Sequence, residues 1–322
     1  MTSIQFEEVS LKFPGASYPA VSNITCEIEA GQFVVILGSS GCGKTTLLKM
    51  VNRLYEPTSG TIYLDGTNIR QINLTTLRQQ IGYVIQQSGL FPHMTVAENI
   101  AVVPKLLGWS RVKYQSRIDE LLTLVDLSPQ LYRNRYPAQL SGGQQQRVGV
   151  ARALAGDPKV MLMDEPFGAI DAITRQTLQT EILRLQNQLK KTILFVSHDV
   201  EEALRLADKI MILNKGQIVQ FDTPLNILTR PANAFVHELI GADDRVRHLS
   251  LLRVEMAMSR VFQESQYQRE YAIAPQDNLR QALSVLLGTG AEHLTVVDQG
   301  KVVGILTLEH ICNSAIIAPI IP

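Results

Sequence analysis

Several features that would narrow the function are scarce in this sequence. Its 322 residues hold only three cysteines, Cys26, Cys42 and Cys312, which are too few and too scattered for a disulfide framework or a zinc site. Thirty basic residues balance thirty acidic ones, so no global field attracts nucleic acid, and we expect no nucleic-acid partner. Apolar runs such as 33–37 are far shorter than the roughly 20 residues of a membrane-spanning helix. Because the N-terminal segment also lacks a signal-peptide core, we expect a cytoplasmic protein.

Apolar segments with strand-like patterns recur along the first two thirds of the chain, and several are followed by helical patterns. Strands that alternate with helices predict an α/β fold with a mostly parallel, covered sheet. Residues 111–154 show helical patterns and few strand signals, which indicates a helical insertion. Lys215-Gly216 is expected to join a hairpin. The predicted strands are 3–12, 24–29, 32–37, 159–163, 192–196, 209–213 and 217–221.

The chain is long enough for one large domain and one small domain. We place the boundary near Gly241, which gives a first domain over residues 1–241 and a second region over residues 242–322. The arginine-rich stretch 242–265 is expected to form a helical linker and a docking surface. Residues 271–317 are expected to form a compact unit of strand, helix, strand, strand and helix, with a turn at Gln299-Gly300.

A glycine-rich loop, GSSGCGKTT, lies between an apolar strand and a helical stretch. In that context backbone N–H groups converge on phosphates, and the helix N-terminus adds a partial positive charge. Lys44 is expected to reach the outer phosphates, and the Thr45 hydroxyl to ligate Mg²⁺. Cys42 is interpreted as a small residue that fits the loop rather than a redox group. The residues expected to contact the nucleotide here are Gly38, Ser39, Ser40, Gly41, Cys42, Gly43, Lys44, Thr45 and Thr46.

Two acids follow the buried strand in VMLMDE. Asp164 is expected to hold Mg²⁺ through water, and Glu165 to polarise the attacking water as a general base. Together with the glycine-rich loop, this pair predicts hydrolysis of a nucleoside triphosphate.

The stretch LSGGQQQR stands between the glycine-rich loop and the acidic pair. Its serine and glycines at a helix start offer a second anion-binding surface, formed by Ser141, Gly142, Gly143 and Gln144. The first loop already binds the phosphates within its own subunit. We therefore expect this second surface to close on the γ-phosphate bound by a partner subunit. The motif matches the signature of the ATP-binding-cassette (ABC) family, and the resemblance covers residues 3 to about 240. It implies a P-loop nucleotide-binding domain with a RecA-like core, an antiparallel β subdomain and a helical signature subdomain, working as a homodimer with ATP and Mg²⁺.

The resemblance implies roles for further residues. Gln86 in GYVIQQ resembles the lid glutamine that contacts Mg²⁺ and water, with Gln87 as a neighbouring candidate. His198 in FVSHD resembles the switch histidine that touches the γ-phosphate. Asp171 in GAID resembles the aspartate loop that communicates across the dimer. For the aromatic residue that stacks on adenine, Phe13 has the expected offset and Tyr18 is the alternative.

The resemblance also implies a membrane partner. In the family, the surface formed here by 88–109 receives a helix from a transmembrane permease subunit, and 91–94 (FPHM) are apolar and loop-like. The stretches KMVNRLYEPTSG, VPKLLGW and MDEPFGAID resemble ATPases of importers for quaternary amines such as glycine betaine, choline and carnitine. Such importers also use a substrate-binding protein, and their ATPase lies on the cytoplasmic face of the membrane as a peripheral subunit. An importer for another solute, such as an amino acid, shares every catalytic motif and stays the alternative.

Residues 271–317 resemble a single cystathionine-β-synthase (CBS) repeat, a small α+β domain that such ATPases often carry. The family's ribose-binding pattern places an aspartate three residues after Ser or Thr, whereas here His310 follows Thr307. That departure argues against nucleotide binding by the tail. A second hypothesis concerns the arginine surface at the start of the tail, which could contact anionic lipid and weaken as internal salt rises; a solvated basic helix that only dimerises is the alternative. The arginines concerned are Arg245, Arg247, Arg253 and Arg260.

Overall fold

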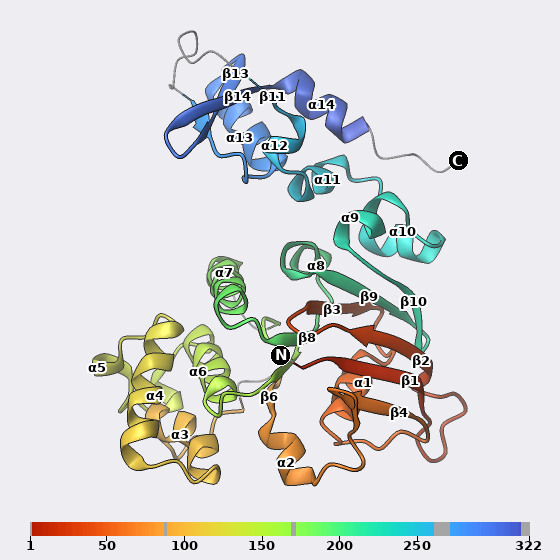
Figure 1. Ribbon diagram of the computed structural model, residues 1–322, viewed down its shortest axis with the longest axis vertical. Coiled ribbons are helices and arrows are strands. Elements are labelled where there is room, and N and C mark those ends of the chain that lie inside the picture. The colour runs from red at the N-terminus through yellow and green to blue at the C-terminus, as the bar shows by residue number, and fades with distance from the viewer. Residues whose placement is uncertain (1, 87–88, 169–171, 261–270, 317–322) are drawn as a thin grey trace. The chain divides into compact units, whose positions relative to one another are not determined.

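The computed structural model describes residues 2–86, 89–168, 172–260 and 271–316. The chain divides into two compact units, residues 1–221 and 222–322 (Figure 1). The sequence placed the division after Gly241 instead. In the structure Gly241 only ends a helix, at a left-handed backbone angle of φ +61°. A glycine that ends a helix resembles a linker in sequence, which is why the predicted boundary lies further along the chain.

The first unit is built from strands and helices that alternate along the chain. Its strands are β1 (Ile4–Leu11), β2 (Val21–Ile28), β3 (Phe33–Gly38), β4 (Ser59–Leu64), β5 (Thr67–Asn68), β6 (Ile81–Val84), β7 (Val160–Asp164), β8 (Thr192–Val196), β9 (Lys209–Asn214) and β10 (Gln217–Asp222). Its helices are α1 (Lys44–Val51), α2 (Leu74–Gln79), α3 (Val96–Leu106), α4 (Arg111–Leu124), α5 (Pro129–Tyr132), the 3-10 turn η1 (Pro137–Gln139), α6 (Gly142–Leu154), α7 (Ala172–Leu189) and α8 (Val200–Leu206). The predicted α/β alternation is thereby confirmed.

A six-stranded sheet in the order β10-β9-β3-β8-β7-β6 forms the centre of this unit. The pairs β3–β8, β3–β9, β7–β8 and β6–β7 are parallel. Every residue of β3, β7 and β8 is buried, as expected for parallel strands covered on both faces. Because parallel strands end at the same edge, Gly38, Asp164 and Val196 lie together where the phosphate motifs begin.

A second, antiparallel sheet in the order β2-β1-β4-β5 packs onto the same core. Ile4 and Phe6 of β1 are buried and, beyond a shift in the pairing register, so are Val9 and Leu11, so one face of the strand points inward. β4 and β5 were not predicted from the sequence, and β2 begins three residues before its predicted start. β4 and β5 carry mixed polar residues, and the pairing of β4 with β1 and of β5 with β4 compensates for a weak local signal.

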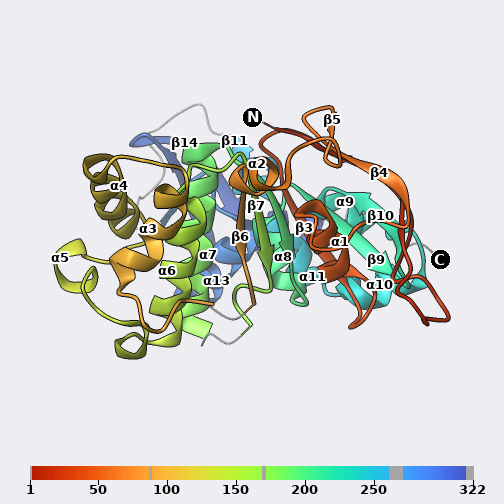
Figure 2. The ribbon, with the colours of Figure 1, turned by 90° about the horizontal axis from the view of Figure 1, so that it is seen from below.

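Helices α3, α4, α5 and α6 gather to one side of the central sheet (Figure 1). Helix α3 starts at a capping box, in which Thr95 and Glu98 bond each other's backbone. Helices α6 and α7 lie side by side in both views (Figure 2). The helical insertion predicted over 111–154 is confirmed, and the structure extends it back to include α3.

The second unit contains helices and a small sheet. Its elements are α9 (Pro224–Thr229), α10 (Ala234–Ile240), α11 (Arg245–Leu251), α12 (Val254–Ala257), β11 (Ser259–Arg260), β12 (Ala272–Ile273), α13 (Leu279–Thr289), β13 (His293–Asp298), β14 (Lys301–Thr307) and α14 (Leu308–Ile316). The sheet order is β11-β14-β13-β12, with β12 parallel to β13 and the other pairs antiparallel. The predicted order of strand, helix, strand, strand and helix is confirmed; β11 was not predicted. No helix in the described part of the chain is long and apolar enough to cross a membrane.

Both predicted two-residue turns have the backbone of tight hairpins. Lys215 and Gly216 adopt φ +46° and +80°, and Gln299 and Gly300 adopt φ +47° and +82°. Positive φ at both central residues is the mark of a type I′ turn, whose twist matches that of the strands it joins. In each turn a glycine occupies the second position, where the left-handed conformation costs it nothing.

Candidate nucleotide site

The loop between β3 and α1 folds closely against its neighbours because it is rich in glycine. Gly38 has φ +149°, and a Cβ built there would lie 2.2 Å from the Leu213 carbonyl oxygen. Gly43, the N-cap of α1, has φ +106°, and its Cβ would lie 2.3 Å from the Ala20 carbonyl oxygen. A Cβ on Gly41 would meet nothing within 4 Å. The two ends of the loop are therefore held against the protein, while its middle faces open space.

We expect Gly43→Ala to destabilise the first unit by at least about 2 kcal/mol, because the new methyl group combines a clash with a left-handed backbone. Gly41→Ala is the matched control: its φ is +77°, but nothing lies within 4 Å, so only the backbone cost of about 1 kcal/mol applies. Denaturant unfolding of the two variants measures the difference. Equal losses of stability in the two variants would contradict the close approach to Ala20.

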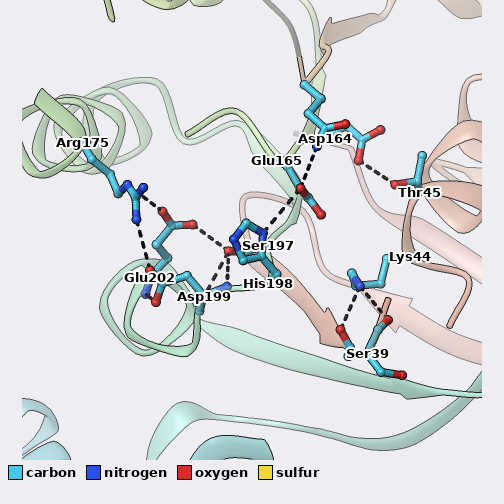
Figure 3. A network of polar contacts seen from close by, with 12 residues as sticks. Ser39, Lys44, Thr45, Asp164, Glu165, Arg175, Ser197, His198, Asp199 and Glu202 are labelled. Carbon is cyan, nitrogen blue, oxygen red and sulfur yellow. Dashed lines mark hydrogen bonds and ion pairs between the residues drawn. The ribbon is translucent and has the colours of Figure 1, made fainter. Parts of the chain in front are cut away.

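Lys44 lies at the start of α1 with its ammonium group held by the loop. Its Nζ donates to the carbonyl oxygens of Gly38 at 2.8 Å and Ser39 at 3.0 Å (Figure 3). The residue is only 7% exposed. The Cys42 sulfur lies 4.0 Å from the same Nζ, and burial raises the pKa of the Cys42 thiol although the nearby Lys44 charge lowers it. A buried thiol with a raised pKa is unreactive, which agrees with the interpretation of Cys42 as a small packing residue.

Thr45 and Asp164 bring two oxygen atoms together from different elements. The Thr45 hydroxyl, on α1, donates to Asp164 Oδ1 at the end of β7 over 2.8 Å. Burial raises the pKa of Asp164, whereas the Thr45 hydrogen bond and the charges of Lys49 and Lys44 lower it. Hydroxyl and carboxylate oxygens are the ligands that Mg²⁺ prefers, and Mg²⁺ keeps several waters in addition to a few protein ligands. The pair therefore fits the predicted Mg²⁺ site.

Glu165 follows β7 directly in an unusual backbone conformation. Its φ is +43°, in the left-handed region that few residues other than glycine adopt, and its N–H donates to the Val196 carbonyl oxygen at 3.0 Å. Gln86 Nε2 donates to Glu165 Oε2 at 2.9 Å, and His198 Nδ1 lies 3.4 Å from the same oxygen (Figure 3). Strained residues gather at functional sites, where the surrounding structure holds them in place. All three predicted catalytic side chains thus meet at one carboxylate oxygen.

A pocket with a volume of about 390 Å³ lies between the glycine-rich loop and Glu165 and His198. Its lining residues are Ser40, Gly41, Gly43, Lys44, Thr45, Thr46, Glu165 and His198. This volume is within the range of ligand-sized pockets. The loop thus supplies backbone N–H groups and one ammonium group on one side, and the acid and the imidazole stand opposite. The arrangement can bind an anionic phosphate chain and hold a general base beside its end.

The signature residues are not among those that line this pocket. Ser141 caps α6: its hydroxyl accepts from the Gln144 N–H at 3.3 Å, and Gln144 Oε1 accepts from the Ser141 N–H at 3.0 Å. Gln144 Nε2 also donates to the Tyr132 hydroxyl at 3.1 Å. Gly142 is exposed, with nothing near the position of its missing Cβ. The side chain of Gln144 is thus engaged within the helix start, whereas Ser141 and Gly142 face outward.

The two aromatic candidates for adenine stacking have different surroundings. Phe13 is half-buried against the core, and its ring meets that of Tyr55 edge-on with centroids 5.2 Å apart. Tyr18 is 84% exposed. Both lie in the connection between β1 and β2, which passes the glycine-rich loop at Ala20. Asp171 and Gln87 lie outside the described residues.

A group of polar residues beside His198 was not predicted from the sequence. Ser197, Asp199 and Glu202 hydrogen-bond one another, and Arg175 of α7 faces the two acids (Figure 3). The segment DVEEAL carries one usable signal, because an aspartate before two acids marks a helix start. Nothing in the sequence connects Arg175 to this loop, since the contact joins two separate helices.

A glycine-rich loop beside a pocket, a hydroxyl–carboxylate pair that fits Mg²⁺, a glutamate contacted by Gln86 and His198, and a separate signature helix are the features predicted for an ATPase of the cassette class. Residues 21–168 match a protein-family model described as ABC transporter. The glycine betaine/carnitine/choline transport ATP-binding protein OpuCA of Bacillus subtilis (strain 168) is 49% identical over 93% of this chain and 76% of its own length. The glycine betaine uptake system ATP-binding protein YehX of Escherichia coli (strain K12) is 48% identical over 97% of this chain and all of its own length.

A solved structure of an ATP-binding cassette is also similar to this chain. A dimer of the ATP-binding cassette MJ0796, described as a post-hydrolysis state bound to ADP and Pi, has a TM-score of 0.62 and 31% identity, over 69% of this chain and 98% of that one. The chain belongs to the ABC transporter family as an ATP-binding subunit. It is therefore an ATPase that uses ATP with Mg²⁺, and subunits of this kind pair with transmembrane permeases and form dimers.

Proposed function

We propose that this chain is the ATP-hydrolysing subunit of an importer that takes up osmoprotectant quaternary amines of the glycine betaine, choline and carnitine type. The observation that carries the ATPase part is the convergence of Gln86 and His198 on Glu165, at the pocket that Lys44 and Thr45 line. The solute class rests on the relatives, whose names specify glycine betaine, carnitine and choline transport. The solute itself does not reach this subunit in our account, so solute specificity lies in the permease and the substrate-binding protein.

At the nucleotide site, we assign the binding of the phosphate chain to the backbone N–H groups of residues 38–46 and to Lys44. Thr45, Asp164 and Gln86 would hold Mg²⁺, which supplies charge neutralisation on the phosphates when bound. Glu165 acts as the general base, and its hydrogen bond from Gln86 orients the carboxylate. His198 lies beside that carboxylate, where it can contact the outermost phosphate.

Two copies of the chain complete the sites. Ser141 and Gly142 face outward at the start of the thirteen-residue helix α6 and are absent from the lining of their own subunit's pocket. A helix N-terminus attracts anions, so each signature is placed to close on the nucleotide of a second copy. Binding would close the dimer, and hydrolysis with release of products would open it.

The loop before α3 is the proposed contact with the permease. Asn99, fully buried, shapes it: its side-chain oxygen accepts from the Phe91 N–H, and its amide donates to the carbonyl oxygens of Phe91 and Met94. Phe91 and His93 are exposed as a result, while Met94 is half-buried. This outcome agrees with a preformed docking loop that lies a few residues after Gln86 along the chain. The ATPase would then be peripheral, on the cytoplasmic face of the membrane.

For the tail, the order of elements supports a CBS-like repeat, but two observations limit its role. His310 helps to cap α14: its Nδ1 accepts from the Thr307 N–H at 3.3 Å, in the place where a ribose-binding aspartate would stand. Arg247 and Arg253 each have a carboxylate within 4 Å, from Asp244 and Glu255. Neighbouring acids thus pair with two of the four arginines of the predicted surface, and we include neither nucleotide binding nor lipid binding by the tail in the proposed function.

The test is ATPase activity of the chain with its permease in lipid vesicles, in the presence of the cognate substrate-binding protein. We expect activity to rise when glycine betaine, choline or carnitine is added, and not when an amino acid such as histidine is added. Activity that responds to an amino acid but to no quaternary amine would replace the proposed solute class with the alternative importer. A vesicle that lacks the binding protein serves as the control for unspecific effects of the solutes.

A further inference from the structure

The short loop that carries His198 is held by polar contacts at both neighbouring residues. Ser197 is buried; its hydroxyl donates to Glu202 Oε2 at 2.6 Å and accepts from the Asp199 N–H at 2.9 Å. Asp199 Oδ1 in turn caps α8, accepting from the N–H groups of Glu201 at 2.8 Å and Glu202 at 3.4 Å. The backbone on either side of His198 is therefore fixed to the first turn of α8.

Arg175 connects this arrangement to α7. Its Nη1 lies 3.4 Å from Asp199 Oδ2, and its Nε lies 3.9 Å from Glu202 Oε1 (Figure 3). Helix α7 follows Glu165 along the chain. Arg175 therefore connects the segment after Glu165 to the loop that carries His198. One guanidinium group thus faces both acids that fix the His198 loop.

Glu202 is the least exposed of the charged residues in the group, at 6%. Burial raises the pKa of this carboxyl, and Asp199 raises it further; the Ser197 hydrogen bond, the Arg175 charge and Gln179 of α7 lower it. Arg205 of α8 contacts Gln179 from the other side. The Arg175 charge is therefore one of the interactions that favour the ionised form of this buried carboxylate.

We propose that Arg175 and Glu202 are positioning residues, whose ion pair acts through Ser197 and Asp199 to hold the His198 imidazole beside the Glu165 carboxylate. The His198 side chain is itself 65% exposed, so packing constrains it little, and its position depends on the backbone that carries it. This inference rests on the proposed function, which gives His198 and Glu165 their roles. It adds two residues that touch neither of them directly.

The experiment uses the full chain with its permease and compares the ATPase kinetics of variants. We expect Arg175→Ala to lower kcat between about 10- and 100-fold, with KM for ATP unchanged within about twofold, because orientation is lost while the binding loop is intact. Arg184→Ala is the matched control: it lies on the same helix, where it is ion-paired with Glu181, and should keep wild-type kcat. Arg175→Ala with wild-type kcat would overturn the proposal.

The pH profile separates positioning from a general loss of stability. Without the Arg175 charge the pKa of Glu202 rises further, so its protonated form persists to higher pH. The acidic limb of the kcat profile should therefore move to higher pH in Arg175→Ala. In Arg175→Ala/Glu202→Gln this shift should vanish and kcat should recover in part, because an amide still accepts from Ser197 without needing a cation. A profile unchanged in shape, with kcat falling only in line with the folded fraction, would also overturn the proposal.

His198→Ala, measured in parallel, separates this inference from the proposed function. If His198→Ala loses activity and Arg175→Ala does not, the positioning role falls and the proposed function stands. If the wild-type complex hydrolyses no ATP, the proposed function falls first.

Discussion

Glu165→Gln should lower ATP turnover by ~10²–10⁴ and leave ATP bound. The amide cannot take a proton from water, yet it keeps the size of the carboxylate and can accept from Gln86 at the same position. Glu165 also has φ +43°, a backbone conformation that glutamine meets at the same cost, so the fold should be preserved. The variant should therefore trap the nucleotide-bound form.

Filter binding of labelled ATP, with turnover measured on the same sample, checks this expectation. Lys44→Ala is the comparison, because it removes the ammonium group from the loop and should lose ATP binding itself. Retention of ATP by Glu165→Gln that is no better than that of Lys44→Ala would show that Glu165 is needed for binding and is not the general base.

Ser141→Arg, introduced into the Glu165→Gln background, should prevent the ATP-dependent dimer without preventing ATP binding. In our account the outward-facing start of α6 closes on the nucleotide of a second copy, so a long side chain there blocks closure. The pocket that binds ATP within one subunit does not include Ser141 and stays intact.

Size-exclusion chromatography of the two variants with ATP, in the absence of the permease, measures this effect. Ser110→Arg is the matched control, since Ser110 caps α4 through the Lys113 N–H just as Ser141 caps α6. Each substitution removes one helix cap, at a cost of about 1 kcal/mol, but only the one at Ser141 should abolish the dimer. If both double variants dimerise with ATP as Glu165→Gln does, the signature has no role in closure.

Much of the nucleotide site could be predicted because its residues follow strands directly. The glycine-rich loop follows β3, the acids end or follow β7, and His198 follows β8, so parallel pairing of these strands brings all of them to one edge. Once β3, β7 and β8 pair in parallel, the polar residues that follow them must lie close together. The loop's contact with Asp164 and the meeting of Gln86 with Glu165 agree with that expectation.

Other features depend on contacts that the sequence does not encode locally. The edge-on contact of Phe13 with Tyr55 could not be predicted from motif spacing alone. Strand β6 is four residues long and became recognisable only through its pairing with β7. Arg175 of α7 contacts Asp199 at the start of α8. Neither the hydrophobic periodicity nor the helix propensity of the sequence predicts this contact between two helices.

The most direct test of the account is ATP-driven uptake of labelled glycine betaine into vesicles that contain the chain, its permease and the cognate binding protein. The account predicts accumulation with wild-type chain and ATP inside the vesicle, and none with Glu165→Gln although that variant binds ATP. Uptake that continues at the wild-type rate with Glu165→Gln would contradict the claim that hydrolysis at this site powers transport.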